Sequence, residues 1–303
     1  MPWKRVLHFS VPLDGNVLTK DGVMAIWSGN ALYILENTGR VAMSSKVDQD
    51  ILSVSLKGGG SFEGHILTDG GVSRFTRMGL LSKVKIEEGA LQILDEQRGQ
   101  LLFGHSDFVS LYDPVKKSTL WTFEGEYFHG RCGAEYLLAG KKLVVLSKTG
   151  ELLLEMPGNW TPLFGDLPSY LGDGIITYKD GAFVGRPALE KISCGGEFDK
   201  KTILANGKTV VLDDRGSVIW EGSLSGTLVG SLEESFLVSK DGSIYAYALI
   251  KDEQELFFEI LCKGKSRCGT FVSSAYTRRC PCCKGEDIVV SRQVVDSRIL
   301  GSE

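Results

Sequence analysis

The stretch "VVLDDRGSVIWEG" (residues 210–222) decides the fold. It contains two short apolar runs, and a polar turn that ends in Gly216 separates them. Two such runs around a tight turn predict a β-hairpin, because glycine adopts the positive φ angle that such turns need. The same arrangement recurs in "VSLYDPVKKSTLWTF" (109–123) and "VVLSKTGELLLEM" (144–156), which indicates an internal repeat.

Each copy of the repeat consists of a strand, a polar turn, a second strand, a turn that often ends in glycine, and a third strand. Seven copies follow one another, at residues 22–47, 64–86, 99–123, 134–156, 174–194, 201–222 and 234–261. Their second turns lie near Gly39, Gly79, Lys117, Gly150, Leu189, Gly216 and Gln254. The spacing of these turns averages about 36 residues, which is typical of propeller blades.

A further short apolar segment precedes the copies, most clearly at residues 51–56, 90–94 and 226–231. Each unit then has four short antiparallel strands joined by turns rich in Gly, Asp and Asn, which is the make-up of a propeller blade. The sequence therefore predicts an all-β fold, a seven-bladed β-propeller with a small Cys-rich C-terminal lobe.

The two ends of the chain carry strands that can close such a ring. Either "RVLHFSV" (5–11) or "EDIVVSRQVVDSRIL" (286–300) can pair with the last blade. Residues 269–296 can instead form an irregular eighth blade. We expect two domains: the propeller at 1–261, and the Cys-rich lobe with a ring-closing strand at 262–303.

The hairpin and its echoes resemble the PQQ-like and WD40-like repeat superfamily of β-propellers, over about residues 20–261. This resemblance implies a closed ring of blades more than it implies a function. The quinoprotein dehydrogenases of that group are secreted and bind a cofactor in the central channel, and no matching cluster of acidic and amide ligands occurs here. WD40 proteins pair Gly-His with a later Trp-Asp. That dipeptide does not follow Gly64-His65 or Gly104-His105, so their hydrogen-bond network is not expected.

Bulky apolar residues recur shortly after the second turn of the repeat. Position four carries Met43, Leu154, Trp220 and Phe258, and Trp121 lies at nearly the same place. Aromatic and large aliphatic side chains contribute much of the energy of buried cores. We therefore expect these residues to pack between neighbouring blades rather than to bind a ligand.

Composition narrows the class of protein. The 303 residues are 43% hydrophobic and 24% charged, which predicts a well-filled core. The net charge of −4 argues against nucleic-acid binding by the whole surface. The N-terminal residues "MPWKRVLHFSVPLDG" make a poor signal peptide, and no apolar run is long enough to span a membrane. We therefore expect a cytoplasmic protein that does not bind membranes.

The sequence contains no enzyme signature. The four histidines, His8, His65, His105 and His129, are scattered over different units with no fixed spacing. Each is better explained as a strand or turn residue than as a ligand. We therefore expect a protein that is not an enzyme, and the sequence identifies no small-molecule substrate.

Five of the seven cysteines lie in "CKGKSRCG" (262–269) and "RRCPCCKG" (278–285). Cys280 and Cys283 have the two-residue gap of a zinc knuckle, and Cys262 and Cys268 form the natural second pair. Four thiolates satisfy tetrahedral Zn²⁺ and leave no open position for catalysis. We expect one structural zinc ion per chain on these four residues.

Other states of these thiols remain open at the sequence level. One or two disulfides, or thiols without a ligand, would fit the same residues, although clustered cysteines in a reducing compartment more often bind metal. Cys282 is spare and can take the place of one ligand. Cys132 and Cys194 are isolated in strands and are better explained as small buried apolar residues.

Positive charge accompanies the clustered cysteines. Six basic residues and no acidic ones lie between Cys262 and Gly285: Lys263, Lys265, Arg267, Arg278, Arg279 and Lys284. With Phe271 and Tyr276 nearby, such a lobe can bind phosphates and stack bases. The alternative is that the cations neutralise a dianionic Zn(Cys)₄ centre and solvate the lobe.

Taken together, these features predict a non-catalytic β-propeller scaffold that mediates protein–protein interaction within a larger complex. The alternative is a nucleic-acid-binding protein, RNA before DNA, that uses the basic Cys-rich lobe. A weaker alternative is an enzyme with its active site in the central channel.

Overall fold

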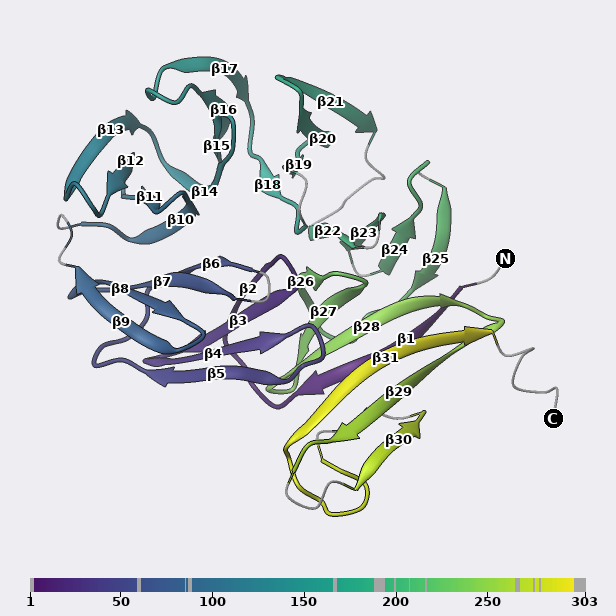
Figure 1. Cartoon of the computed structure of the whole chain (residues 1–303). Coiled ribbons are helices and arrows are strands. Elements are labelled where there is room, and N and C mark those ends of the chain that lie inside the picture. The colour runs from purple at the N-terminus through teal and green to yellow at the C-terminus, as the bar shows by residue number, and fades with distance from the viewer. Residues whose placement is uncertain are drawn as a thin grey trace.

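The computed structural model describes residues 3–58, 61–84, 86, 89–165, 168–187, 194–198, 200–206, 208–215, 217–264, 268–274, 276–277 and 279–296. These residues form eight antiparallel sheets and contain no helix (Figure 1). Seven sheets have four strands and one has three. The all-β propeller that the repeats predict is therefore confirmed.

The first three blades follow the chain in order from their inner to their outer strands. Blade 1 holds β2 (Asn16–Lys20), β3 (Val23–Ser28), β4 (Ala31–Glu36) and β5 (Val41–Lys46). Blade 2 holds β6 (Ser53–Lys57), β7 (Glu63–Thr68), β8 (Gly71–Thr76) and β9 (Gly79–Val84). Blade 3 holds β10 (Gln92–Gln97), β11 (Gln100–Gly104), β12 (Phe108–Asp113) and β13 (Ser118–Glu124).

Blades 4 to 6 continue in the same manner. Blade 4 holds β14 (Tyr127–Cys132), β15 (Tyr136–Gly140), β16 (Lys142–Leu146) and β17 (Leu152–Pro157). Blade 5 holds β18 (Thr161–Pro162), β19 (Ser169–Leu171), β20 (Gly174–Lys179) and β21 (Ala182–Pro187). Blade 6 holds β22 (Cys194–Phe198), β23 (Lys201–Asn206), β24 (Lys208–Leu212) and β25 (Val218–Gly222).

Blade 7 closes the ring with both ends of the propeller sequence. It holds β26 (Thr227–Leu232), β27 (Ser235–Lys240) and β28 (Ser243–Lys251), and β1 (Trp3–Val11) pairs with β28 as its outer strand. The inner strand β26 contacts both β22 and β2, so blades 6, 7 and 1 are consecutive in space. Of the two segments expected to close the ring, the N-terminal one does so.

The remaining sheet consists of β29 (Gln254–Cys262), β30 (Gly269–Ser273) and β31 (Ile288–Asp296), with β29 in the middle. Figure 1 shows it outside the ring beside β28 and β1. The repeat pattern placed residues 254–261 in the seventh copy, and that assignment was wrong, because β29 pairs with β30 and β31 instead. The segment 286–300 likewise supplies β31 rather than a ring-closing strand.

The core lies between the blades. Among the described residues, seven clusters of buried side chains each join two neighbouring blades, and an eighth joins blade 7 to the three-stranded sheet. Met43, Trp121 and Trp220 contribute to these interfaces as expected. Phe258 is buried in the eighth cluster, whereas Leu154 is 42% exposed, so the expectation was wrong for that residue.

The second turns of the repeat are confirmed in the first four blades, where Gly39, Gly79, Lys117 and Gly150 all have positive φ. In the fifth copy the prediction assigned each strand to a position one too early in the blade. Residues 174–179 and 182–187 form the third and outer strands, so the corresponding turn lies at Asp180–Gly181. The predicted turn at Leu189 falls outside the described residues, as does Gly216.

Gly150 shows how a turn of one blade packs on its neighbour. A Cβ atom added to Gly150, whose φ is +84°, would lie 2.8 Å from Cγ of Trp121 in blade 3. Gly181 has nearly the same φ, +82°, but no atom within 4 Å of that position. Comparing the same substitution at the two glycines therefore distinguishes the cost of backbone strain from the cost of packing against the neighbouring blade.

We expect Gly181→Ala to lower the free energy of unfolding by about 1 kcal/mol, the cost of a left-handed backbone for alanine. Gly150→Ala should lower the free energy of unfolding by about 1–3 kcal/mol more than Gly181→Ala does, because the added methyl group must displace the packed indole ring of Trp121. Urea unfolding of both variants measures the difference. Equal losses would show that the turn does not press on Trp121.

No helix in the described part of the chain is long and apolar enough to cross a membrane.

Candidate functional site

Four cysteines meet at one end of the three-stranded sheet. Cys262 ends β29 and faces Gly269, the first residue of β30, so Cys268 lies beside it. Cys280 and Cys283 belong to the segment that leads into β31. The four Sγ atoms all lie within 4.8 Å of one another, and those of Cys262 and Cys283 are 3.8 Å apart. Cys282 is exposed and outside this group.

This spacing suits coordination by a metal ion better than disulfide bonding. A disulfide requires an S–S distance of about 2.05 Å, and all seven cysteines are free thiols. Four thiolates around a tetrahedral ion with metal–sulfur bonds of about 2.3 Å would be about 3.8 Å apart. The four sulfur atoms can therefore hold one metal ion, and these are the four residues that the sequence singled out.

The backbone around Cys280 is folded tightly. Its N–H donates to the Gly285 carbonyl at 2.8 Å, and its own carbonyl accepts from Lys284 N–H at 3.0 Å. Burial raises the pKa of the Cys280 thiol, but hydrogen bonds from the backbone N–H groups of Cys283 and Cys282 outweigh it and lower the pKa to about 7. Burial and hydrogen bonds with the neighbouring thiols raise the pKa of Cys268. A bound metal cation would stabilise the ionised, thiolate form of all four cysteines.

The positive charge of the lobe is partly neutralised. Arg279 donates from Nε and Nη2 to Oε1 of Glu286, at 3.1 and 2.9 Å. Lys284 Nζ donates to the Pro281 carbonyl, and Lys263 is exposed. The other three predicted contact residues, Lys265, Arg267 and Arg278, lie outside the described residues.

The two aromatic residues of the lobe have different surroundings. The ring of Tyr276 lies 5.6 Å from that of Phe258 and 6.2 Å from that of Phe9 in β1, so this side chain joins the lobe to blade 7. Phe271 packs at the edge of the same cluster. Tyr276 is therefore engaged in holding the lobe against the ring, where it is poorly placed to stack on a base.

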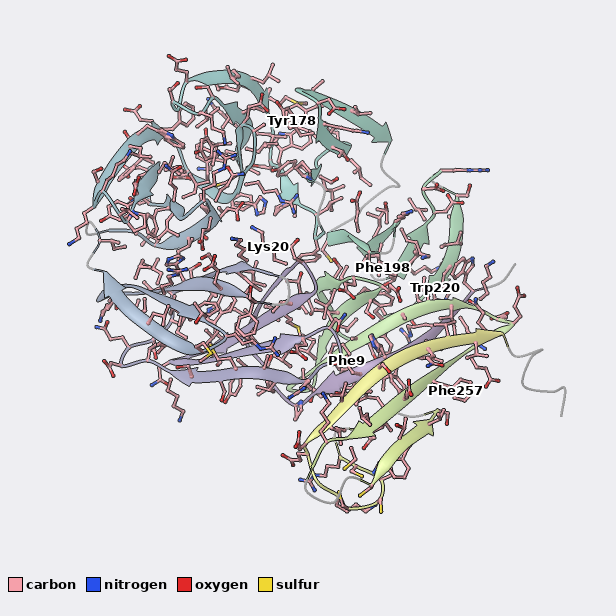
Figure 2. All side chains as sticks on the ribbon, viewed as in Figure 1. Phe9, Lys20, Tyr178, Phe198, Trp220 and Phe257 are labelled. Carbon is pink, nitrogen blue, oxygen red and sulfur yellow. The ribbon has the colours of Figure 1, made fainter. Side chains whose placement is uncertain are left out.

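Charged side chains also gather in the middle of the ring, which the sequence reasoning missed. Figure 2 places Lys20 there, and its Nζ lies 2.7 Å from Oδ1 of Asp95. The other oxygen of Asp95 accepts the N–H of Cys132 at 2.8 Å, which links blades 1, 3 and 4. His129 lines the same cavity of about 370 Å³, and its burial, with the positive charge of Arg131, lowers its pKa to about 4.

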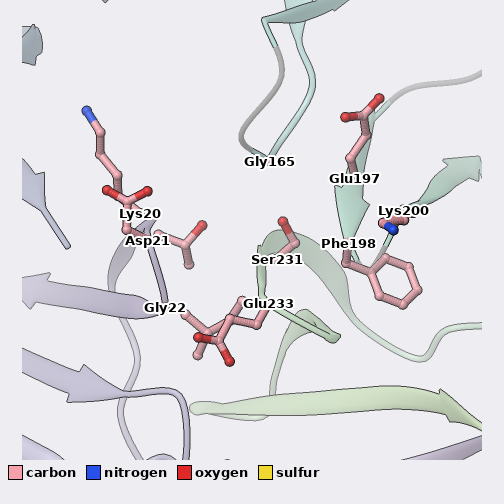
Figure 3. A pocket seen from close by; sticks show the side chains of 11 residues that line it. Lys20, Asp21, Gly22, Gly165, Glu197, Phe198, Lys200, Ser231 and Glu233 are labelled. Atoms are coloured by element: carbon pink, nitrogen blue, oxygen red, sulfur yellow. The ribbon is translucent and has the colours of Figure 1, made fainter. Parts of the chain in front are cut away.

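A second cavity, of about 560 Å³, opens where inner strands turn into second strands (Figure 3). Asp21 and Glu233 reach it from the turns after β2 and β26, and Lys200 from the turn after β22. The sequence does carry a signal for these groups. Charged residues recur at the ends of the inner strands, at Lys20, Glu96, Arg131 and Glu197.

A third cavity, of about 730 Å³, contains a buried histidine. His65 Nδ1 lies 2.8 Å from Oε2 of Glu96, and Ser55 Oγ donates to the same oxygen at 2.8 Å. Burial raises the pKa of Glu96, but the hydrogen bond from His65 helps to bring it below its usual value. The serine binds the carboxylate rather than the imidazole, so it is not activated as a nucleophile.

No family model matches the sequence, and no curated protein matches it. Solved structures show the same fold at low sequence identity. BamB from Moraxella catarrhalis is 12% identical, with a TM-score of 0.55 over 81% of this chain and 100% of its own. The Pan2 WD40 domain of Neurospora crassa is 11% identical, with a TM-score of 0.60 over 80% and 94%.

A third structure, BBS1N in complex with ARL6DN, is 13% identical, with a TM-score of 0.58 over 83% of this chain and 99% of its own. Identities this low show the fold and not the function. The chain is therefore a β-propeller with the fold of PQQ-like and WD40 propellers, and its C-terminal cysteine cluster can hold a metal ion.

Proposed function

We propose that this chain is a non-catalytic scaffold that binds another protein within a larger cytoplasmic assembly, and that a structural zinc ion holds its C-terminal lobe. Propellers of this fold support the first part, since BBS1N is solved in complex with ARL6DN. The four-sulfur geometry supports the second.

The outer strand of blade 4 is the observation that carries the proposal. Leu152, Leu153 and Leu154 are three consecutive leucines in β17, and each is between 42% and 49% exposed. The other edge of β17 has no partner strand among the described residues. Exposed apolar side chains on an unpaired strand edge are a hazard that proteins usually cover or remove. A protein partner that packs on β17 would bury them.

The buried serine–histidine pairs support a role without catalysis. His8 Nδ1 lies 2.8 Å from Ser235 Oγ, and His105 Nε2 lies 2.9 Å from Ser110 Oγ. All four residues are buried, so a substrate cannot reach the hydroxyl groups. These pairs stabilise the blades and do not form an active site.

The tagged full-length protein, purified from its native cells, should retain a stoichiometric protein partner after nuclease treatment. Replacing all three leucines of β17 by serine should reduce that recovery by about tenfold or more, as expected when anchor residues of an interface are lost. Val218→Ser is the matched control, because Val218 is 55% exposed on the outer strand of blade 6.

Three results would contradict the proposal: no stoichiometric partner, loss of the partner on nuclease treatment, or equal recovery with the triple variant. The sedimentation of the pure protein should not change with the triple substitution. If it did, the surface would join two copies of this chain instead.

A further inference from the structure

We infer that the cavity at the inner turns of blades 1, 6 and 7 (Figure 3) binds one guanidinium group, held by Asp21, Ser231 and Glu233. The cavity has a volume of about 560 Å³. A space of this size suits a small molecule or one side chain of a partner. The site depends neither on the surface on β17 nor on the cysteine cluster.

The turns of blades 1 and 7 bring two carboxylates to the same cavity. Asp21 follows β2 and Glu233 follows β26, and these two inner strands contact each other. The turns themselves also meet, because a Cβ atom added to Gly22 would lie 2.5 Å from Oε1 of Glu233. The other oxygen of Glu233 accepts from Asn37 Nδ2 at 2.6 Å, a contact that brings no positive charge. Among the described residues neither carboxylate has a cationic partner.

A hydroxyl group from the interior of blade 7 reaches the same cavity. Ser231 lies two positions before Glu233 and is only 7% exposed. Figure 3 shows its side chain pointing from β26 towards the loop at Gly165, across the cavity. In the part of the chain that the structure describes, this hydroxyl has no hydrogen-bond partner. Because Ser231 lines the cavity, a ligand bound there can supply the missing partner.

Two sets of charges around the cavity cancel. Lys20 Nζ lies 2.7 Å from Oδ1 of Asp95, so its positive charge is already compensated. On the wall near Gly165, Glu197 contributes a negative charge. Arg131, whose Nη2 donates to the Gly165 carbonyl, contributes a positive one. These four side chains therefore leave no net charge beside the cavity.

The remaining charges leave one negative charge in excess. Asp21 and Glu233 supply two negative charges, and Lys200, in the turn after β22, supplies one positive charge. None of these three forms an ion pair within the described ranges. A monocation in the cavity would balance them, whereas an anion or a dication would not. The charge balance therefore selects a ligand group with a single positive charge.

The acceptors favour a guanidinium group over an ammonium group. They comprise two carboxylates on different turns and one hydroxyl on a strand, and a guanidinium group offers five N–H donors in one rigid plane. It is also more weakly hydrated than an ammonium group. Leu232 and the ring of Phe198 line the same cavity and can pack on an adjoining alkyl chain. The ligand is therefore an alkylguanidinium, either free or as the arginine side chain of a polypeptide.

Titration of the full chain with N-acetylarginine amide, followed by NMR, tests the assignment. We expect saturable binding near one equivalent, weakened by salt because charges attract each other in the complex. The matching citrulline derivative has nearly the same shape without the charge and should not bind. Butylguanidinium identifies the source of the group. Tighter binding of the arginine derivative assigns the group to a polypeptide, and tighter binding of butylguanidinium assigns it to a free alkylguanidine.

Two substitutions should change the affinity for N-acetylarginine amide in opposite directions. Asp21→Asn should weaken binding by about tenfold or more, the typical effect of losing a hydrogen bond between charged groups. Asp21 is exposed with a φ of +47°, which asparagine tolerates, so the variant should fold normally. Lys200→Gln should tighten binding by about two- to fivefold, because it removes a positive charge that repels the ligand.

Asp180→Asn is the matched control. Asp180 is also an exposed aspartate in a turn, with a φ of +51°, but it does not line this cavity. We expect its affinity for N-acetylarginine amide to equal that of the wild type. Absence of saturable binding, equal affinity for the citrulline derivative, an Asp21→Asn variant that binds as tightly as the wild type, or weaker binding by Lys200→Gln would each overturn the inference.

Discussion

Cys280→Ser should reduce the zinc content of the purified protein from about one equivalent per chain to nearly none. Cys280 is 0% exposed, and the backbone N–H groups of Cys282 and Cys283 are directed at its sulfur. A serine hydroxyl is a poor zinc ligand and would leave only three thiols, those of Cys262, Cys268 and Cys283, to hold the ion. Elemental analysis of protein purified without added metal measures the loss.

The same substitution should loosen the lobe while the ring stays folded. Binding of zinc to small cysteine-rich units is worth about 10–16 kcal/mol of folding free energy, because the site does not exist in the unfolded chain. The seven inter-blade clusters do not use the four cysteines. Hydrogen exchange should therefore rise in β29–β31 and remain unchanged in blades 1 to 6.

Cys282→Ser provides the control for this experiment. Cys282 differs from Cys280 by two positions but is exposed and lies outside the group of four sulfur atoms. We expect that variant to retain its zinc. If Cys282→Ser lost the metal and Cys280→Ser kept it, the proposed ligand set would be wrong.

Local pattern was sufficient to predict the repeat where a blade has four full strands. It failed in blade 5, because β18 and β19 have only two and three residues and show no alternation. The pattern therefore assigns β20 and β21, which have six residues each, to the second and third strand positions of the blade, whereas they occupy the third and fourth. A short strand is held by its neighbours in space, and that information is not in its own residues.

The seventh copy failed for a different reason. Both β1 and β29 are nine-residue strands with buried apolar residues, and either could pair with β28 on pattern alone. The choice depends on a contact between residues about 240 positions apart, such as Phe9 with Ala246. Hydrophobic period fixes which face of a strand is buried, and it does not identify the partner strand.

The cysteine cluster and the cavity that contains His65 show the same contrast. The four cysteines are grouped within 22 positions, and a hairpin and a tight turn bring them together, so their spacing could predict a cluster. His65 and Glu96 belong to different blades, and their contact depends on how blades 2 and 3 face each other. A single histidine in a strand therefore gave no sign of a cavity.

Phe9→Ala should lower the free energy of unfolding by about 3–5 kcal/mol, the usual cost of truncating a buried phenylalanine. Phe9 is 0% exposed in the strand that closes the ring. A Cβ atom on Gly39 of blade 1 would lie 2.5 Å from Cδ2 of its ring, and the ring of Tyr276 in the lobe lies 6.2 Å from it. One side chain therefore joins blade 7, blade 1 and the lobe.

Phe75→Ala is the matched variant, since Phe75 is also 0% exposed but belongs to blade 2, in the cluster that joins blades 1 and 2. Both substitutions remove the same atoms, so urea unfolding should show losses of similar size. Their hydrogen exchange should differ. Phe9→Ala should raise exchange in β28 and also in β29, through the lost contact with Tyr276, whereas Phe75→Ala should raise it in blades 1 and 2 and not in β29. Unchanged exchange in β29 of Phe9→Ala would mean that the lobe is held without this contact, by the other residues of the cluster that joins it to blade 7, such as Ile250 and Phe258.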